Sequence, residues 1–76
     1  MISILREALG RHPFQPVTLV MANGETVTIE NGNFAVVLPK AGMVYVEKPR
    51  EREPRFLNLL LLREIRTKGL TPDFKD

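Results

Sequence analysis

The clearest pattern of hydrophobic and polar positions is a pair of β-rich runs in residues 17–29, joined around Asn23-Gly24. Asn-Gly between two such runs is the strongest short-range signal of a β-hairpin. A two-residue loop would mix apolar and polar side chains on both faces of the hairpin. A three-residue loop, with Gly24 at positive φ, separates them, as a half-buried antiparallel sheet requires. We therefore predict the three-residue loop, which places four side chains on the buried face: Val17, Leu19, Val27 and Ile29.

The flanking segments predict one helix and two more strands. Residues 3–9 carry a single apolar stripe and end at Gly10, which predicts a short N-terminal helix capped by Ser3. Turn-forming residues then separate two apolar runs, which predict strands over residues 34–38 and 43–47. The proline-containing, charged stretch that follows predicts a solvated loop.

The leucine-rich segment at residues 56–65 is apolar enough to be buried, but its type stays open. As a helix it would begin at Asn58 and stop at Gly69. As a strand it would be apolar on both faces. Two preceding prolines and four strands in need of closure favour a strand, without deciding between strand and helix over residues 57–68.

These elements predict a mainly β fold with one N-terminal helix. Short strands about ten residues apart are typical of a five-stranded antiparallel small barrel or curled sheet. We expect one domain over residues 1–70 and a flexible C-terminal tail at residues 71–76.

The size of the chain makes self-association attractive. A domain of 76 residues buries only about 60% of the surface that its unfolded chain exposes. Small domains compensate with disulfides, metals or oligomerisation. With no cysteine and a single histidine, only oligomerisation remains. The absence of cysteine, of a secretory pattern in residues 1–10 and of a long apolar run leads us to expect a cytoplasmic location and no membrane contact.

The residue types needed for catalysis do not occur in a useful combination. His12 has no cysteine to pair with, and Ser3 is the single serine, so no nucleophilic triad can be built. The carboxylates mostly lie in turns, the charged loop or the tail, and the glycines lie in separate turns rather than in a phosphate loop. We therefore expect no enzymatic activity, no cofactor and no metal.

The charge pattern offers a nucleic-acid alternative. Net charge is +2, but residues 48–68 carry seven of the eleven basic side chains. Arginines near an aromatic residue, Tyr45 or Phe56, can follow a phosphate backbone while bases stack. Interleaved glutamates favour a solvated face instead. The candidate nucleic-acid contacts are Arg50, Arg52, Arg55, Arg63, Arg66 and Lys68.

The leucine run is the preferred candidate for an interaction surface. A strand that is apolar on both faces is covered either by the N-terminal helix or by another subunit, and the second option agrees with the small size of the domain. We expect Leu60→Asp to prevent folding or assembly. The candidate interface residues are Leu57, Leu59, Leu60, Leu61 and Leu62.

Four segments together resemble a group of short uncharacterised bacterial proteins that are abundant in planctomycetes. They are Pro13-Phe14-Gln15-Pro16, Ala22-Asn23-Gly24, Asn33-Phe34-Ala35-Val36 and the leucine run, and the likeness covers about residues 4–66. That family has no established activity, so the resemblance implies an organisation and no chemistry. The helix, the Asn-Gly strand and the strands that follow are also similar to the Sm-like RNA chaperones, which implies an SH3/Sm-like barrel. The second Sm signature is missing from residues 56–65, so the resemblance gives no residue an RNA-binding role.

The preferred function from the sequence is a non-catalytic protein-interaction or assembly module that forms a homo-oligomer. Its contact surface would be the leucine strand and a free sheet edge, facing a second copy or another protein. The alternative is an RNA- or DNA-binding module that uses the basic residues between positions 48 and 68.

Overall fold

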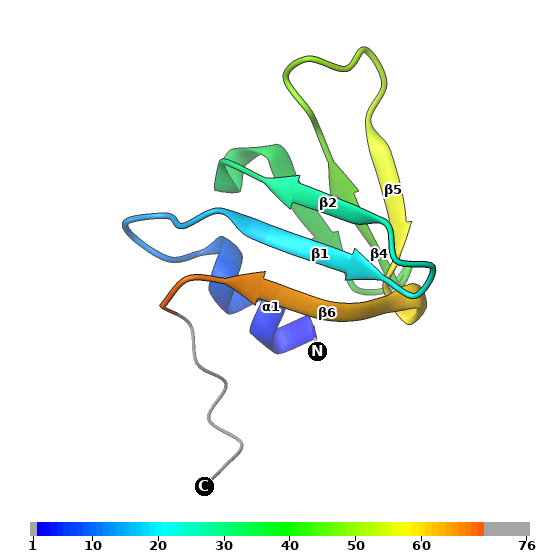
Figure 1. Ribbon diagram of the computed structural model, residues 1–76, viewed down its shortest axis with the longest axis horizontal. Helices are drawn as coiled ribbons and strands as arrows, with labels where there is room; N and C mark the ends of the chain where they lie inside the picture. Colours follow the sequence, from blue (N-terminus) through cyan, green and yellow to red (C-terminus); the bar gives the residue numbers. More distant parts are fainter. Residues whose placement is uncertain (1, 70–76) are drawn as a thin grey trace, which may run out of the picture.

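The computed structural model describes residues 2–69 and contains one helix and two three-stranded antiparallel sheets in that range (Figure 1). The first sheet has the strand order β2-β1-β6 and the second has the order β3-β4-β5. Two short 3-10 turns, η1 and η2, precede β3 and β6. The bounds are α1 Ile2–Leu9, β1 Val17–Met21, β2 Thr26–Ile29, η1 Gly32–Phe34, β3 Ala35–Leu38, β4 Met43–Val46, β5 Arg55–Asn58, η2 Leu59–Leu61 and β6 Leu62–Thr67.

The hairpin of β1 and β2 has the predicted register, with Leu19 opposite Val27. The loop has the predicted three residues, since the Gly24 N–H donates to the Met21 carbonyl at 2.9 Å and the Met21 N–H donates to the Glu25 carbonyl at 2.8 Å. Gly24 has φ of 91°, a region that side chains disfavour. All four side chains assigned to the buried face are at most 2% exposed.

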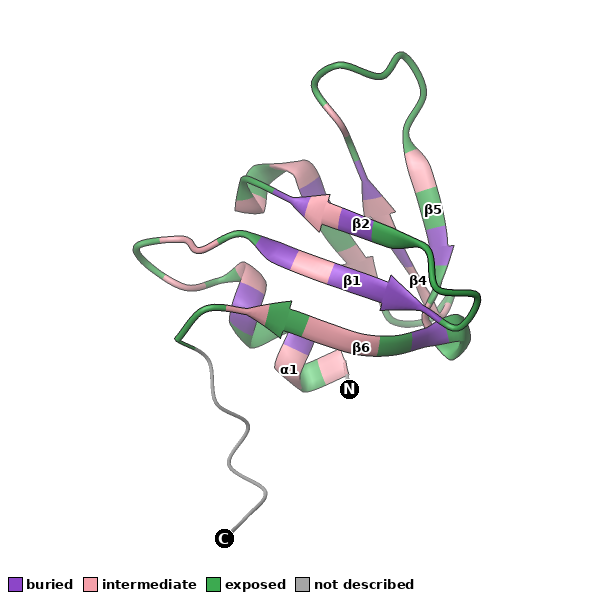
Figure 2. Ribbon diagram, in the orientation of Figure 1, coloured by how far each residue is buried: buried purple, intermediate pink, exposed green. Residues whose placement is uncertain are grey.

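Strand β1 is the centre of the first sheet, because it pairs with β2 on one side and with the last strand, β6, on the other. Figure 2 shows buried positions along most of β1 and at alternate positions of β2 and β4. In the second sheet, Val44 lies opposite Leu57 on the inner face. The inner faces of both sheets and the α1 side chains Leu5 and Ala8 form one core.

The N-terminal helix and its connector are fixed by close backbone contacts. Gly10 ends α1 as predicted, with its N–H donating to the Arg6 carbonyl at 3.0 Å. A Cβ added at Gly32 would lie 2.8 Å from the Leu9 carbonyl oxygen, so η1 packs directly against the end of α1. The Arg11 guanidinium donates to the Lys68 carbonyl at 2.8 Å and ties the connector to the end of β6.

Two sequence predictions about element boundaries are wrong. Ser3 lies inside α1 and does not cap it, since the helix already includes Ile2. The leucine-rich segment is neither one strand nor one helix: β5 ends at Asn58, η2 follows, and β6 starts at Leu62. The described chain therefore has six strands in two sheets, and these do not close into the predicted five-stranded barrel.

The break in the leucine run has a local and a tertiary cause. The Asn58 side chain accepts a hydrogen bond from the Leu60 N–H at 2.9 Å, which caps a 3-10 turn. The Leu59 N–H donates to the Gly42 carbonyl at 2.8 Å, and the Leu61 carbonyl accepts from the Ala22 N–H at 2.7 Å. These bonds hold the turn between the two sheets, so the chain crosses from one sheet to the other at η2.

Within residues 2–69, no helix is long and apolar enough to span a bilayer. The predicted tail at residues 71–76 lies outside the described residues.

Candidate interaction surface

The leucine run places large apolar side chains on the surface of the second sheet's last strand and of the turn after it. Phe56 in β5 is 55% exposed, and Leu60 and Leu61 in η2 are 90% and 53% exposed. We call these three residues the β5-η2 surface. Contiguous exposed apolar patches, unlike single exposed apolar side chains, are typical of interaction sites.

The other predicted interface leucines lie inside the chain's own core. Leu57 is 7% exposed and Leu62 is 9% exposed, and Leu59 is partly buried against the same core. The 3-10 turn explains this division, because it interrupts the period of two that a continuous strand would impose. Of the five leucines proposed from the sequence, only Leu60 and Leu61 are available to a partner.

A groove of about 380 Å³ opens beside the β5-η2 surface, between the β1–β2 loop and β5. Its apolar lining comes from Met21, Ala22, Phe56, Leu57 and Leu61. Met21 and Leu57 are each less than 8% exposed, so they form its floor. A groove with an apolar floor favours an apolar side chain over a polar ligand.

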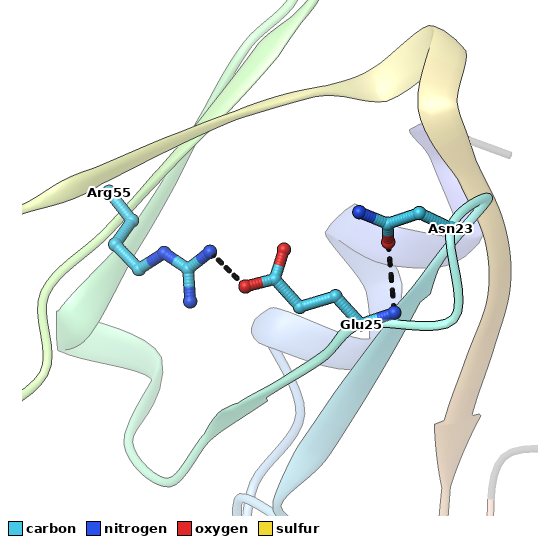
Figure 3. Close-up of polar contacts among 3 residues, drawn as sticks. All are labelled: Asn23, Glu25 and Arg55. Carbon is cyan, nitrogen blue, oxygen red and sulfur yellow. Dashed lines mark hydrogen bonds and ion pairs between the residues drawn. The ribbon is translucent and has the colours of Figure 1, made fainter.

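An ion pair spans the rim of this groove and links the two sheets. An Arg55 Nη from β5 lies 2.5 Å from a carboxylate oxygen of Glu25, the residue just before β2 (Figure 3). The Asn23 side chain accepts from the Glu25 N–H at 2.9 Å and fixes the loop that carries this carboxylate. Since both side chains are at least one-third exposed, such a pair contributes at most about 1 kcal/mol, and its main effect is to place opposite charges on the rim.

The outer face of the second sheet continues the apolar surface beyond Phe56. Tyr45 lies between Val36 and Phe56 in the register of the three strands. The Tyr45 and Phe56 rings have centroids 5.2 Å apart and planes tilted by 58°. The Tyr45 hydroxyl donates to a Glu47 carboxylate oxygen at 2.9 Å, and this hydrogen bond, with slight desolvation and the negative charge, raises the pKa of Tyr45.

Sequence reasoning named neither the groove nor the exposed Val36, which lies outside the β5-η2 surface on the opposite edge strand, β3. The alternation within residues 34–38 and 43–47 carried a signal for Val36, because it places Val36 and Tyr45 on the same face once the strands are paired. The sequence carried no such signal for the groove, because the groove is lined by the β1–β2 loop and by β5, which are far apart in the sequence.

The basic residues do not gather into one patch. Arg50 and Arg52 are exposed in the loop before β5, whereas Arg63 and Arg66 are exposed on β6. This loop and β6 lie at opposite ends of the view in Figure 1, with Lys68 just beyond β6.

Two of these arginines are already paired within the chain. Arg55 contacts Glu25, and Arg66 contacts Glu64 at 3.0 Å. The hydrogen bond from Arg66, followed by the charges of Arg66 and Arg63, lowers the pKa of Glu64 below its ordinary value. Glutamates therefore offset part of the positive charge that a phosphate backbone would need.

The residues considered for catalysis and metal binding lie apart in the described part of the chain. His12 lies exposed in the connector between α1 and β1. Among residues 2–69, no three histidine or carboxylate side chains gather where they could hold a metal ion.

Comparisons of the chain with protein-family models, with curated proteins and with solved structures found no match. The candidate function therefore rests on the geometry of the chain itself.

Proposed function

We propose that this chain is a non-catalytic protein-interaction module that assembles with itself through the β5-η2 surface. The observation that carries the proposal is the exposure of Phe56, Leu60 and Leu61 beside an apolar groove. Their burial in an assembly is favourable by about 25 cal/mol for each Å² of apolar surface removed from water. A chain of 76 residues has few other ways to gain stability.

Unpaired strand edges on both sides of η2 support the same surface. Strand β5 is an edge of the second sheet, and β6 is an edge of the first. In residues 2–69, no strand pairs with the outer side of either one. Free backbone donors and acceptors at such edges add hydrogen bonds to an apolar contact.

The scaffold that we propose for this surface is an open, curled arrangement of the two sheets, of the SH3/Sm-like type but not closed into a barrel. The pairing of β1 with β6 supports it, because the last strand returns to the first. The turn η2 connects the two sheets, so the exposed leucines lie where the chain changes sheets.

The alternative function, RNA or DNA binding, has weaker support. Its candidate side chains fall into two separate groups, and Arg55 and Arg66 already contact carboxylates. Binding through phosphates would also weaken steeply with salt, whereas an apolar contact persists. The salt dependence therefore separates the two functions.

The test is size-exclusion chromatography with light scattering and absorbance at two wavelengths, at low and high salt. We expect an assembly free of nucleic acid at both salt concentrations. Leu60→Asp should be a folded monomer, because a side chain that is 90% exposed contributes little to the fold. The sequence alone predicted that Leu60→Asp would prevent folding or assembly; the exposure of Leu60 narrows that prediction to a loss of assembly.

The matched control is Val36→Asp, which places the same charge at an apolar side chain that is 51% exposed on β3, the opposite edge of the sheet. We expect this variant to stay assembled. Dissociation by Val36→Asp alone would move the contact to the outer face of the sheet and contradict our assignment. A wild-type monomer would overturn self-association, and co-purified nucleic acid that is lost at high salt would favour the alternative.

A further inference from the structure

Leu60 has the properties of a side chain prepared for insertion into a partner. It is the most exposed large apolar side chain in the described chain, at 90%. Its backbone is nevertheless fixed, because the Asn58 side chain accepts from the Leu60 N–H and both neighbouring leucines bond to other loops. An apolar projection on a backbone that is already fixed loses little backbone entropy when it binds.

The groove that could receive this side chain lies next to it. Leu61, the following residue, lines the groove together with Phe56, while Leu60 does not contribute to the lining. The groove of about 380 Å³ has an apolar floor and opens to the solvent. Asn58 and Leu61, on either side of Leu60 in the chain, both line the groove, so the turn that carries the projection forms one edge of the groove.

This placement is self-complementary. When a projection and its matching groove lie on the same surface patch, a two-fold axis lets two copies exchange them, and the contact closes at a dimer. A head-to-tail contact would instead need the two features on different sides of the molecule. The adjacency of Leu60 and the groove thus favours a symmetric pair.

The charges on the rim point to the same partner. Glu25 and Arg55 place one negative and one positive side chain beside the groove, 2.5 Å apart. These two side chains already pair with each other, so the rim carries no net charge, and the equally neutral rim of a second copy meets it without repulsion. A partner with a strongly basic or acidic surface would gain nothing from this neutral rim.

We infer that two copies of this chain form a symmetric dimer in which Leu60 of each copy inserts into the groove of the other. This inference rests on the proposed function and names its partner and geometry. Each dimer buries two copies of Leu60, so Leu60→Ala should weaken dimerisation on the order of 100-fold or more.

Site-directed crosslinking tests the geometry, and the absence of cysteine from the chain makes it clean. Leu60→Cys places a thiol on the projection, and Ala22→Cys places one on the exposed lining of the groove. The two variants are mixed in equal amounts and oxidised, and intact mass spectrometry distinguishes the mixed dimer from either homodimer. We expect the mixed disulfide to predominate.

The control is a mixture of Leu60→Cys with Val36→Cys, which should give no mixed disulfide in excess. If wild-type protein assembles but the crosslink forms between two copies of Leu60→Cys, or equally with Val36→Cys, the symmetric insertion is wrong and the proposed function stands. An assembly larger than a dimer would likewise overturn the symmetric insertion and leave the proposed function standing. A wild-type monomer overturns both.

Discussion

Leu57 and Leu60 are three residues apart in one apolar run, yet the structure assigns them opposite energetic roles. Leu57 is 7% exposed and lies opposite Val44 in the core, while Leu60 is 90% exposed. Truncation of each side chain to alanine should therefore separate folding from assembly. We expect Leu57→Ala to destabilise the fold and Leu60→Ala to leave the isolated monomer unchanged.

The magnitudes follow from burial. Leu→Ala in a core costs about 2–5 kcal/mol, depending on how far the site can relax. Leu57 lies on an edge strand and lines an open groove, so water can enter the space, and the lower half of that range, about 2–3 kcal/mol, applies. At roughly 0.05–0.15 kcal/mol per residue, the whole domain has about 4–11 kcal/mol of stability. Loss of Leu57 is therefore severe, whereas Leu60→Ala should change monomer stability by at most about 0.5 kcal/mol.

The assay is equilibrium urea unfolding at two protein concentrations, because assembly stabilises the folded state by mass action. At low concentration, Leu57→Ala should have a lower midpoint than wild type, and Leu60→Ala should match wild type. At high concentration, wild type should gain stability and Leu60→Ala should gain less. A destabilisation of Leu60→Ala by more than about 1 kcal/mol at low concentration, where side chains this exposed should matter little, would refute the reasoning.

Two further predictions concern packing and ionisation. Gly32→Ala should destabilise the fold by about 1–2 kcal/mol in the same urea assay, because its Cβ would meet the Leu9 carbonyl oxygen at 2.8 Å. The control Gly10→Ala should leave stability unchanged, because nothing would lie nearer than 3.4 Å to its Cβ. Tyr45 should ionise above its ordinary pKa near 10, and Glu47→Gln should lower that pKa, as followed by tyrosinate absorbance of the single tyrosine. Because the native state holds this proton more tightly, its contribution to stability is present below pH 10 and is lost as the pH rises through the native pKa. An unchanged titration in Glu47→Gln would show that the hydrogen bond does not act on Tyr45.

The hairpin could be predicted in detail because its information is local. Gly24 needs a positive φ, and only one register separates apolar from polar side chains, so residues 17–29 are sufficient to define it. The end of α1 at Gly10 is local in the same sense. The start of that helix could not be predicted in this way. Serine can cap a helix or lie inside one, and in the structure Ser3 lies inside α1.

The turn within the leucine run could not be predicted from the same kind of information. Asn58 gives a local signal, because asparagine favours turns and caps. The turn also depends on hydrogen bonds to the backbone of Gly42 and Ala22, which come from two different hairpin loops. A pattern of side chains along one segment contains no information about these distant carbonyl and N–H groups. The sequence accordingly named all five leucines as one candidate interface, whereas the structure buries Leu57 and Leu62 and exposes Leu60 and Leu61.

The position of the exposed leucines argues that they serve an interaction and not the fold. A small domain buries only a modest apolar surface and depends on each side chain that it buries. Leu60, at 90% exposure, contributes almost nothing to the stability of the monomer. The turn needs the Asn58 cap and the two backbone bonds, and none of these depends on a leucine side chain at position 60. A polar residue would satisfy the turn equally well and would avoid aggregation. An apolar side chain carried on a fixed backbone next to an apolar groove is what the proposed assembly requires, because a second copy of the chain would supply both matching features at once.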